Sequence, residues 1–376
     1  MKNNIKIHLA RPDITQAEIE RVIKVLKTPS LALGPTIKKF EDKIAQYAER
    51  KYAVAVNSGT SALHLIVQSL GIGPGDEVIT TPFSFIASAN CILFVGAKPV
   101  FIDIDPQSLN LDPSQIEKKI TSTTKAILAV DIFGHPADWT PILKIAKKHK
   151  LMVIEDSCEA LGSEYEGVKC GGFGDTAAFA FYPNKQITTG EGGMIVTDNK
   201  KIYEICLSLR NQGRDAQGGW LEHKRLGYNY RISDINCALG LAQLKRLNHM
   251  AKKRAKVAKM YDYYLRDCPN IKLPFKAGDV KINRFVYVIQ LDSQFSQTDR
   301  DRILSKLRQK GIACSNYFAP IHLQPFYQEL FGYKKGNFPI TEHVSERTIA
   351  LPFYNDLGKS KIQFIAKVLN KYIKQG

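Results

Sequence analysis

The sequence predicts an α/β protein with a large, mainly parallel sheet and a smaller C-terminal α/β domain. In the first half of the chain, near-continuous apolar strands alternate with helical patterns, which is typical of a parallel sheet covered on both faces. The 376 residues also exceed the length of one small compact domain. A long helical pattern, about 233–265, is expected to connect a large domain, 1–245, with a small domain, 246–376.

Two helices are expected before the sheet begins. Thr15 and Glu18 form a capping box ahead of an apolar stripe, and Pro35 occupies the first position of the second helix. Apolar runs separated by helical patterns then predict the parallel strands, at residues 53–57, 77–81, 98–105, 125–130 and 151–156. Ligands of such sheets bind at the carboxyl ends of the strands, so catalytic groups are expected there.

The remaining elements follow from the same patterns. Two apolar runs, 177–182 and 194–197, are expected to complete the sheet of the large domain. The small domain is expected to contain a strand at 284–291, a helix near Ile303 and a final helix at 359–374.

The net charge of +17 raises the possibility of an anionic partner. Lysine and arginine are spread along the chain, and only the segment 245–259 is dense in them; a solvated face of an amphipathic helix explains this segment. A diffuse positive field attracts a dianionic nucleotide-sugar as well as a nucleic acid. Charge alone therefore does not identify the partner.

Several classes of protein are not expected. The amino terminus lacks an apolar core region and no run of about 18 apolar residues occurs, so neither a signal peptide nor a membrane span is predicted. A cytoplasmic location is the corresponding expectation. The seven cysteines are scattered and contain no CxxC pair, which argues against a disulfide framework and a zinc site. No metal is expected.

Lys185 lies on a loop between two apolar runs. Pro183 and Asn184 end the first run, and the glycine-rich segment 190–193 precedes the second. An amine flanked by apolar and aromatic residues loses hydration, which favours the neutral form that attacks a carbonyl. The loop therefore suggests a lysine that forms a Schiff base, although a surface lysine on a hairpin gives the same pattern.

Two strand ends carry groups that suit a cofactor with a phosphate and a pyridine ring. Ser58, Gly59 and Thr60 join a strand to a helix, where backbone N–H groups and two hydroxyls can bind a phosphate dianion. Asp156 ends the last parallel strand, where a carboxylate can pair with a pyridinium nitrogen. Each group alone also fits a plain helix N-cap. Their order along the chain, with Lys185 next, favours a shared site.

The segment FYPNKQITTGEGG, 181–193, resembles the lysine loop of the sugar aminotransferases of the DegT/DnrJ/EryC1/StrS family. These enzymes use pyridoxal 5'-phosphate (PLP) and have fold type I, with a three-layer large domain. The resemblance extends from RPDIT near residue 11 to LPFYND near residue 351. It implies PLP bound to Lys185 as a Schiff base, with its phosphate at Ser58, Gly59 and Thr60 and its pyridinium nitrogen at Asp156.

The resemblance also assigns residues around the ring and in the partner subunit. Phe85 matches the aromatic residue that stacks on the pyridine face, and a core phenylalanine is the alternative. Asn229 matches an asparagine that reaches the PLP phosphate of the other subunit, which implies a homodimer with active sites at the interface. Arg231 contacts a phosphate or braces its loop. His322 is either structural or contacts the diphosphate of the substrate.

Two positions depart from the family pattern. Glu159 stands where relatives usually have a glutamine beside the phenolic oxygen of the cofactor. A carboxylate would repel a phenolate, so Glu159 is either protonated or turned toward the substrate. Ala180 stands where relatives often have a serine or threonine as a phosphate ligand, so the phosphate is expected to depend more on the other ligands or on water.

The activity that these residues imply is a two-step amino transfer. From the family, L-glutamate is the expected donor and a 4-keto-6-deoxy nucleotide-sugar the expected acceptor, for polysaccharide or glycoconjugate biosynthesis; a 3-keto sugar or an inosose stays open. The family's dehydratases have a histidine in place of Lys185. A DNA-binding regulator would fit the charge, but no helix-turn-helix or basic arm is present. Neither a nucleic-acid nor a membrane partner is expected.

Overall fold

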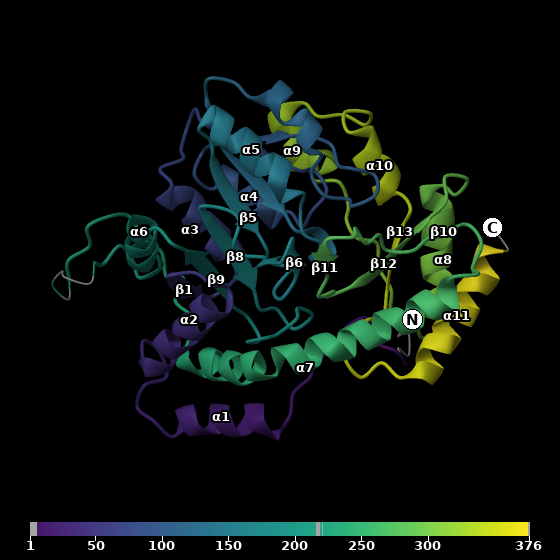
Figure 1. Cartoon of the computed structure of the whole chain (residues 1–376), viewed down its shortest axis with the longest axis horizontal. Helices are drawn as coiled ribbons and strands as arrows, with labels where there is room; N and C mark the ends of the chain where they lie inside the picture. Colours follow the sequence, from purple (N-terminus) through teal and green to yellow (C-terminus); the bar gives the residue numbers. More distant parts are fainter. Residues whose placement is uncertain (1–5, 216–218, 220, 375–376) are drawn as a thin grey trace.

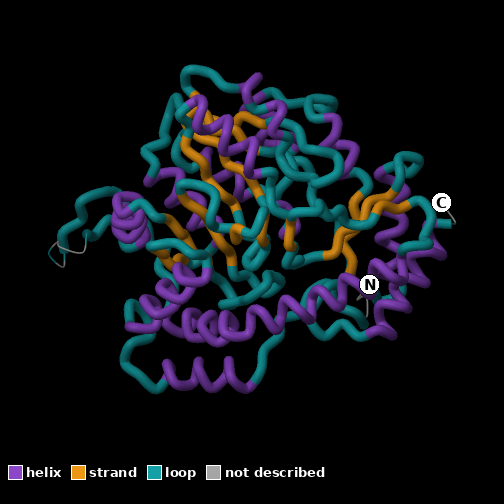
Figure 2. The backbone as a smooth tube through the Cα atoms, in the orientation of Figure 1, coloured by secondary structure: helices purple, strands orange, loops and turns teal. Residues whose placement is uncertain are grey.

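The computed structural model describes residues 6–215, 219 and 221–374. A seven-stranded sheet lies at the centre of the fold, in the strand order β1-β9-β8-β5-β4-β2-β3 (Figure 2). Neighbouring strands are parallel except at β9, which runs antiparallel to β1 and β8. The strands are β1 (Tyr52–Val56), β2 (Glu77–Thr80), β3 (Lys98–Phe101), β4 (Thr124–Val130), β5 (Met152–Asp156), β8 (Thr176–Ala180) and β9 (Gly193–Thr197). The predicted α/β fold with a mainly parallel sheet is confirmed.

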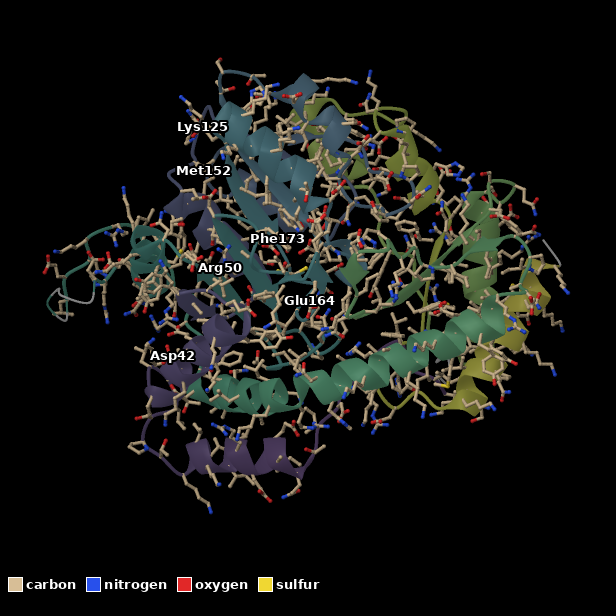
Figure 3. The ribbon with its side chains drawn as sticks, in the orientation of Figure 1. Asp42, Arg50, Lys125, Met152, Glu164 and Phe173 are labelled. Carbon is tan, nitrogen blue, oxygen red and sulfur yellow. The ribbon has the colours of Figure 1, made fainter. Side chains whose placement is uncertain are left out.

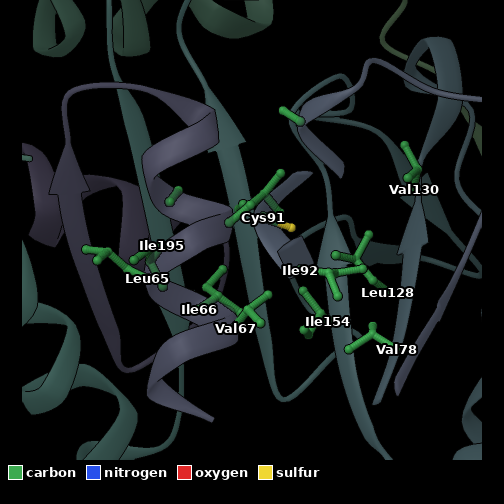
Figure 4. Close-up of a cluster of buried hydrophobic side chains, with 14 of the residues drawn as sticks. Leu65, Ile66, Val67, Val78, Cys91, Ile92, Leu128, Val130, Ile154 and Ile195 are labelled. Carbon is green, nitrogen blue, oxygen red and sulfur yellow. The ribbon is translucent and has the colours of Figure 1, made fainter. Parts of the chain in front are cut away.

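Helices cover both faces of this sheet because successive strand residues point to opposite cores. Ile154 lies in one apolar cluster with Leu65 of α3 and Ile92 of α4 (Figure 4), whereas Val153 lies in another with Trp139 of α5. The helices of this part are α1 (Gln16–Leu26), α2 (Pro35–Tyr47), α3 (Gly59–Ser69), α4 (Ala87–Leu93), α5 (Trp139–His149) and α6 (Lys200–Arg210), with short 3-10 turns η1 (Pro113–Gln115), η2 (Glu117–Lys119) and η3 (Ile132–Gly134).

Both expected N-terminal helices are present. Thr15 and Glu18 form the predicted capping box of α1, and Pro35 opens α2. Phe40 of α2 is fully buried against Phe181, with ring centroids 5.3 Å apart. Helix α2 therefore packs directly against the segment that leads from β8 to Lys185.

Helix α7 (Asp234–Leu265) runs along one side of the molecule and joins two apolar cores (Figure 1). Its first half contributes Leu241 to the core beside the large sheet, and its second half contributes Tyr261 to a second core. A Cβ at Gly240 would come within 2.7 Å of the Phe40 ring, so the glycine allows α7 and α2 to approach closely. The long connecting helix is thus present at the expected place.

The second core lies around a three-stranded antiparallel sheet in the order β10-β12-β13. Its strands and helices are β10 (Ile271–Lys272), β12 (Tyr287–Leu291), β13 (Thr348–Leu351), α8 (Gln297–Gln309) and α11 (Lys359–Ile373).

The segment 321–345 packs elsewhere, on the β3 edge of the large sheet, where Tyr327 and Phe338 meet Phe101. It contains η4 (Ile321–Leu323), α9 (Pro325–Phe331) and α10 (Pro339–Ser345). The chain after residue 245 is therefore divided between two cores, and the domain boundary at 245 stays a prediction.

A third small sheet, in the order β11-β6-β7, connects the two parts of the chain. It consists of β6 (Glu164–Tyr165), β7 (Val168–Lys169) and β11 (Val280–Lys281). Lys281 pairs with Glu164 at 2.6 Å across two of these strands, and Glu164 is labelled in Figure 3. None of the described helices is long and apolar enough to cross a membrane.

Candidate active site

A cavity of about 670 Å³ lies at the carboxyl ends of β4 and β5. Seven of the ten predicted site residues line it: Ser58, Gly59, Thr60, Phe85, Asp156, Glu159 and Lys185. The C-terminal part of the chain adds Phe285, Asn316, Tyr317 and Phe318 to the wall. Groups from distant parts of the sequence therefore meet in one space.

The start of α3 forms one end of this cavity. Ser58 is the N-cap of the helix, and its hydroxyl accepts a hydrogen bond from the Ser61 N–H at 3.1 Å. The N–H groups of Gly59 and Thr60 belong to the first turn, which has no acceptors of its own. A Cβ at Gly59 would lie 2.8 Å from the Ala180 side chain, so only glycine leaves this position open. The helix start can therefore receive an anion, and Ala180 adds no hydroxyl to it.

Asp156 adds a buried carboxylate to the wall of the cavity. The residue is 3% exposed; its Oδ2 accepts a hydrogen bond from the Ser88 hydroxyl at 2.7 Å and its Oδ1 accepts one from the Cys158 N–H at 3.2 Å. Ser84 contacts the same serine at 2.8 Å. A carboxylate offers about four acceptor positions, so Asp156 can still accept a proton donor from the cavity.

Lys185 lies on the loop between β8 and β9, as the sequence predicts. Its N–H donates to the Tyr182 carbonyl at 2.9 Å, which closes a tight turn. The side chain is 13% exposed, and Nζ lies 3.4 Å from Oε1 of Glu159. Nζ also lies 4.2 Å from the centre of the Phe285 ring. The amine is therefore held between a carboxylate and an aromatic ring in the wall of the cavity.

Glu159 is fixed between two partners. Its Oε2 accepts a hydrogen bond from the Phe133 N–H at 2.8 Å, while Oε1 faces Lys185. Burial raises the pKa of the Glu159 carboxyl, and the charge of Lys185 acts in the opposite direction. The carboxyl thus faces the amine of Lys185 rather than solvent.

Phe85 is 59% exposed although it lines the cavity. An aromatic ring that forms a cavity wall without being buried offers its face to a ligand. This placement argues against the alternative that Phe85 is an ordinary core residue.

Asn229 and Arg231 lie outside this cavity. The Asn229 carbonyl accepts a hydrogen bond from the Asn57 side chain at 3.5 Å, and the residue forms an isolated bridge with Asn211. Arg231 donates from Nη1 to Asn211 Oδ1 at 2.9 Å and to Gln212 Oε1 at 3.2 Å. Within its own chain, Arg231 therefore braces the loop.

His322 also lies outside this cavity. It is fully buried, its Nε2 lies 3.0 Å from Oε1 of Glu342, and its ring packs against Phe338. The residue does not line the cavity and has no exposed surface from which to reach a diphosphate. Of the two roles that the sequence left open, this placement favours the structural one, in the segment that covers the β3 edge.

Three residues near the reactive groups were not identified from the sequence. Ser88 orients Asp156, Phe285 lies beside Lys185, and Arg254 donates from Nη2 to the Lys185 carbonyl at 2.9 Å. The only signal for the first of them was the pair of serines at positions 84 and 88, just before and within α4. Arg254 belongs to the basic segment attributed to a solvated face, yet it is 4% exposed.

A flat ring with an aldehyde, a phosphate and a protonated nitrogen would find a partner for each polar group in this cavity. The open position at Gly59 and the free acceptor capacity of Asp156 both fit such a ligand. The class of protein that fold and site define is a PLP-dependent enzyme of fold type I.

The family model of the DegT/DnrJ/EryC1/StrS aminotransferases matches residues 12–370. The chain belongs to this family and is a PLP-dependent sugar aminotransferase. GDP-perosamine synthase of Escherichia coli O157:H7 is 36% identical over 367 residues, which cover 97% of this chain and 98% of the relative.

Solved structures agree with this assignment. Helicobacter pylori PseC, an aminotransferase involved in the biosynthesis of pseudoaminic acid, is 33% identical with a TM-score of 0.93, over 98% of this chain and 100% of that chain. The PLP-form of the putative sugar aminotransferase Spr1654 from Streptococcus pneumoniae is 29% identical with a TM-score of 0.93, over 98% and 99% of the two chains. PLP is therefore the cofactor of this protein.

Proposed function

We propose that this aminotransferase moves an amino group from L-glutamate to the ketone of a nucleotide-linked 4-keto-6-deoxy sugar, for polysaccharide or glycoconjugate biosynthesis. Its similarity to a GDP-perosamine synthase and to an enzyme of pseudoaminic acid biosynthesis supports this acceptor class. The observation that carries the proposal is the meeting of Lys185, Asp156 and the start of α3 in one cavity.

Each residue has a distinct role in the proposed reaction. When bound, PLP supplies the electron sink that stabilises a carbanion at the Cα of the amino acid. Ser58, Gly59 and Thr60 bind the phosphate, and Phe85 covers the ring. Asp156 holds the proton of the ring nitrogen. Lys185 would tether the cofactor through its amine, and the same amine would accept the proton from Cα, so one residue would serve as tether and general base.

Glu159 is proposed to orient the keto-sugar. Its carboxyl lies beside the amine of Lys185 and is anchored by Phe133, so it can direct a substrate group toward that amine. In Glu159→Gln, we expect the ratio of kcat/KM between two keto-sugars to change about tenfold, which corresponds to ~1.4 kcal/mol. Rates and preferences equal to those of the wild type would show that Glu159 has no such role.

A homodimer is proposed to complete the site. Asn229 is proposed to reach the PLP phosphate of the partner subunit, which compensates in part for the missing hydroxyl at Ala180. Arg231 is proposed to lie near the diphosphate of the substrate. Both residues lie on a loop that follows Lys185 in the chain and does not line its cavity, so their proposed contribution depends on the second subunit.

The test of the proposed function begins with the bound cofactor. Purified protein is expected to be yellow, and borohydride is expected to fix the cofactor to Lys185, as read by peptide mass. Lys185→Ala is expected to retain PLP without a covalent bond and to lose about 10²–10⁴-fold in turnover, because tether and base are both removed. Lys38→Ala, on the exposed face of α2, is the control. Colourless protein that binds no PLP, or retained turnover in Lys185→Ala, would refute the proposal.

The acceptor is identified by product mass. The PLP-bound protein is incubated with L-glutamate and a panel of nucleotide-sugars that carry the ketone at different carbons. Amination of the 4-keto-6-deoxy members is the expected result. Selective amination of a 3-keto sugar or an inosose would replace the proposed acceptor and leave the aminotransferase assignment unchanged.

A further inference from the structure

Arg254 is a buried cation in the middle of α7. It is 4% exposed, and no carboxylate among the described residues forms an ion pair with it, whereas its neighbour Lys253 pairs with Asp13 and Asp356. Burial lowers the pKa of the Arg254 guanidinium to about 10, although the charge of Asp13 acts in the opposite direction. Removing a charge from water without a paired counter-ion costs several kcal/mol. Other interactions of Arg254 must therefore offset this cost.

The hydrogen bonds of Arg254 to backbone carbonyls supply these interactions. Nη2 donates to the Lys185 carbonyl at 2.9 Å, and Nη1 donates to the Phe285 carbonyl at 3.2 Å and weakly to the Arg284 carbonyl at 3.5 Å. One planar guanidinium therefore connects two backbone segments that are far apart in sequence. These are the segments that place the amine of Lys185 and the ring of Phe285 side by side in the cavity.

The loop that carries Lys185 is held from a second side by Gln186. Its amide nitrogen donates to the Asn283 carbonyl at 2.7 Å and also contacts the Glu159 carbonyl. The peptide unit between residues 185 and 186 is thus fixed against α7, against the strand region near 285 and against the segment after β5. A loop with these anchors presents its side chain in one direction, which lowers the entropy cost of reaching a reactive geometry.

We propose that Arg254 is a positioning residue for the aminotransfer reaction, which fixes Lys185 and Phe285 relative to each other through their backbone carbonyls. The proposal rests on Lys185 as the lysine that binds PLP. Arg254 does not contact the substrate in this role; it acts through the loop. Its fork geometry matters because a guanidinium reaches two carbonyls at once, whereas a lysine ammonium at the end of a flexible stem does not.

The experiment compares Arg254→Gln and Arg254→Lys with the wild type. Cofactor-free protein is mixed with PLP, and the rate at which the visible band of the lysine-bound cofactor develops is measured together with kcat, KM and Tm. A hydrogen bond from a charged group is worth roughly 1.5–3 kcal/mol, so Arg254→Gln is expected to slow both the linkage and kcat by about 10- to 100-fold. The KM for the keto-sugar is expected to stay unchanged. Arg254→Lys is expected to show a linkage rate and a kcat between those of the wild type and those of Arg254→Gln.

Arg300→Gln is the control, because Arg300 is also buried and donates to a backbone carbonyl, that of Ser345 at 2.9 Å, far from Lys185 in sequence; unlike Arg254, it also pairs with a carboxylate, that of Asp301 at 2.6 Å. It is expected to lower Tm without slowing the linkage. The positioning role would be overturned if Arg254→Gln had the linkage rate and kcat of the wild type. If Arg254→Gln does not fold, the same result in Arg254→Lys would overturn it. Failure of the wild-type protein itself to form a borohydride-stable bond at Lys185 would instead refute the proposed function.

Discussion

Asp131 and Glu155 are two buried carboxyls that share one serine. Ser157 Oγ lies 2.5 Å from Oδ2 of Asp131 and 2.8 Å from Oε1 of Glu155, and all three side chains are fully buried. A hydroxyl has one hydrogen to donate, so both contacts are hydrogen bonds only if one carboxyl carries a proton. Burial raises the pKa of both carboxyls, and the charge of Glu155 raises the pKa of Asp131 further. The pair therefore retains one proton.

That proton belongs on Asp131. Backbone N–H groups of Gly171, Phe173 and Gly174 donate to Glu155, which favours its anion. The carboxyls and the Cys170 thiol are close enough to be considered as metal ligands, but hydrogen bonds already account for the positions of both carboxyls. Because Glu155 precedes Asp156 in β5, this network also holds the strand end that presents Asp156 to the cavity.

Asp131→Asn tests the shared proton. An amide can donate to Ser157 while its oxygen still accepts from the Ala137 N–H and the Trp139 ring, so the fold is expected to tolerate it. Since the folded pKa of Asp131 is raised, its contribution to stability is complete below about pH 4 and is lost as pH rises toward the folded value. Between the unfolded and the folded pKa of Asp131, the free energy of unfolding of the wild type is expected to fall, relative to that of the variant, by up to about 1.4 kcal/mol per pH unit. Urea unfolding measures this difference.

Asp13→Asn provides a control of opposite sign. Burial acts to raise the pKa of Asp13, but hydrogen bonds from Arg246, Asn355 and Lys253 outweigh it and lower the pKa to about 2. A lowered folded pKa contributes stability above the unfolded value of about 4, which is lost as pH falls. The cost of Asp13→Asn is therefore expected to shrink in acid. Parallel pH curves for wild type and Asp131→Asn would contradict the shared proton.

At the scale of elements, the sequence predicted what is encoded in consecutive residues. The capping box at Thr15, the start of α2 at Pro35 and the strands of the large sheet all follow from local spacing. The lysine loop and the strand end at Asp156 could also be recognised within a few consecutive residues. In each of them the polar side chain lies next to the turn or strand end that presents it. Local chemistry made these residues candidates, and their order along the chain together with the family resemblance gave them their expected roles.

Elements whose surroundings come from distant segments were not predictable in this way. His322 lies in a short motif, but its environment is set by Glu342 on α10, and α10 is held on the β3 edge because Asp103 accepts hydrogen bonds from the N–H groups of Ile340 and Thr341. Nothing near residue 322 in the sequence indicates that edge. Arg254 shows the same limit, since a helical charge pattern does not reveal which cation points inward.

At the scale of the whole molecule, exposed apolar side chains mark a surface that a partner would cover. On α1 and the loop after it, five such residues are 41% to 57% exposed: Ile19, Ile23, Leu26, Leu31 and Leu33. Clustered apolar side chains of this kind are typical of interaction sites. The proposed homodimer provides a partner for such a surface, and it also gives Asn229 a site outside its own chain.

Mixed dimers test whether Asn229 acts across the interface. Asn229→Ala is expected to weaken PLP binding and lower activity by about 10- to 100-fold, because a hydrogen bond to a charged phosphate is lost. After dissociation and random reassociation with an equal amount of Lys185→Ala subunits, half of the dimers are mixed, and each mixed dimer has one site with both residues intact. About a quarter of wild-type activity should therefore return. Each variant treated alone is the control. If Asn229 served its own chain, no site in the mixed dimer would gain activity, and mixing would leave the rate at the level of the separate variants.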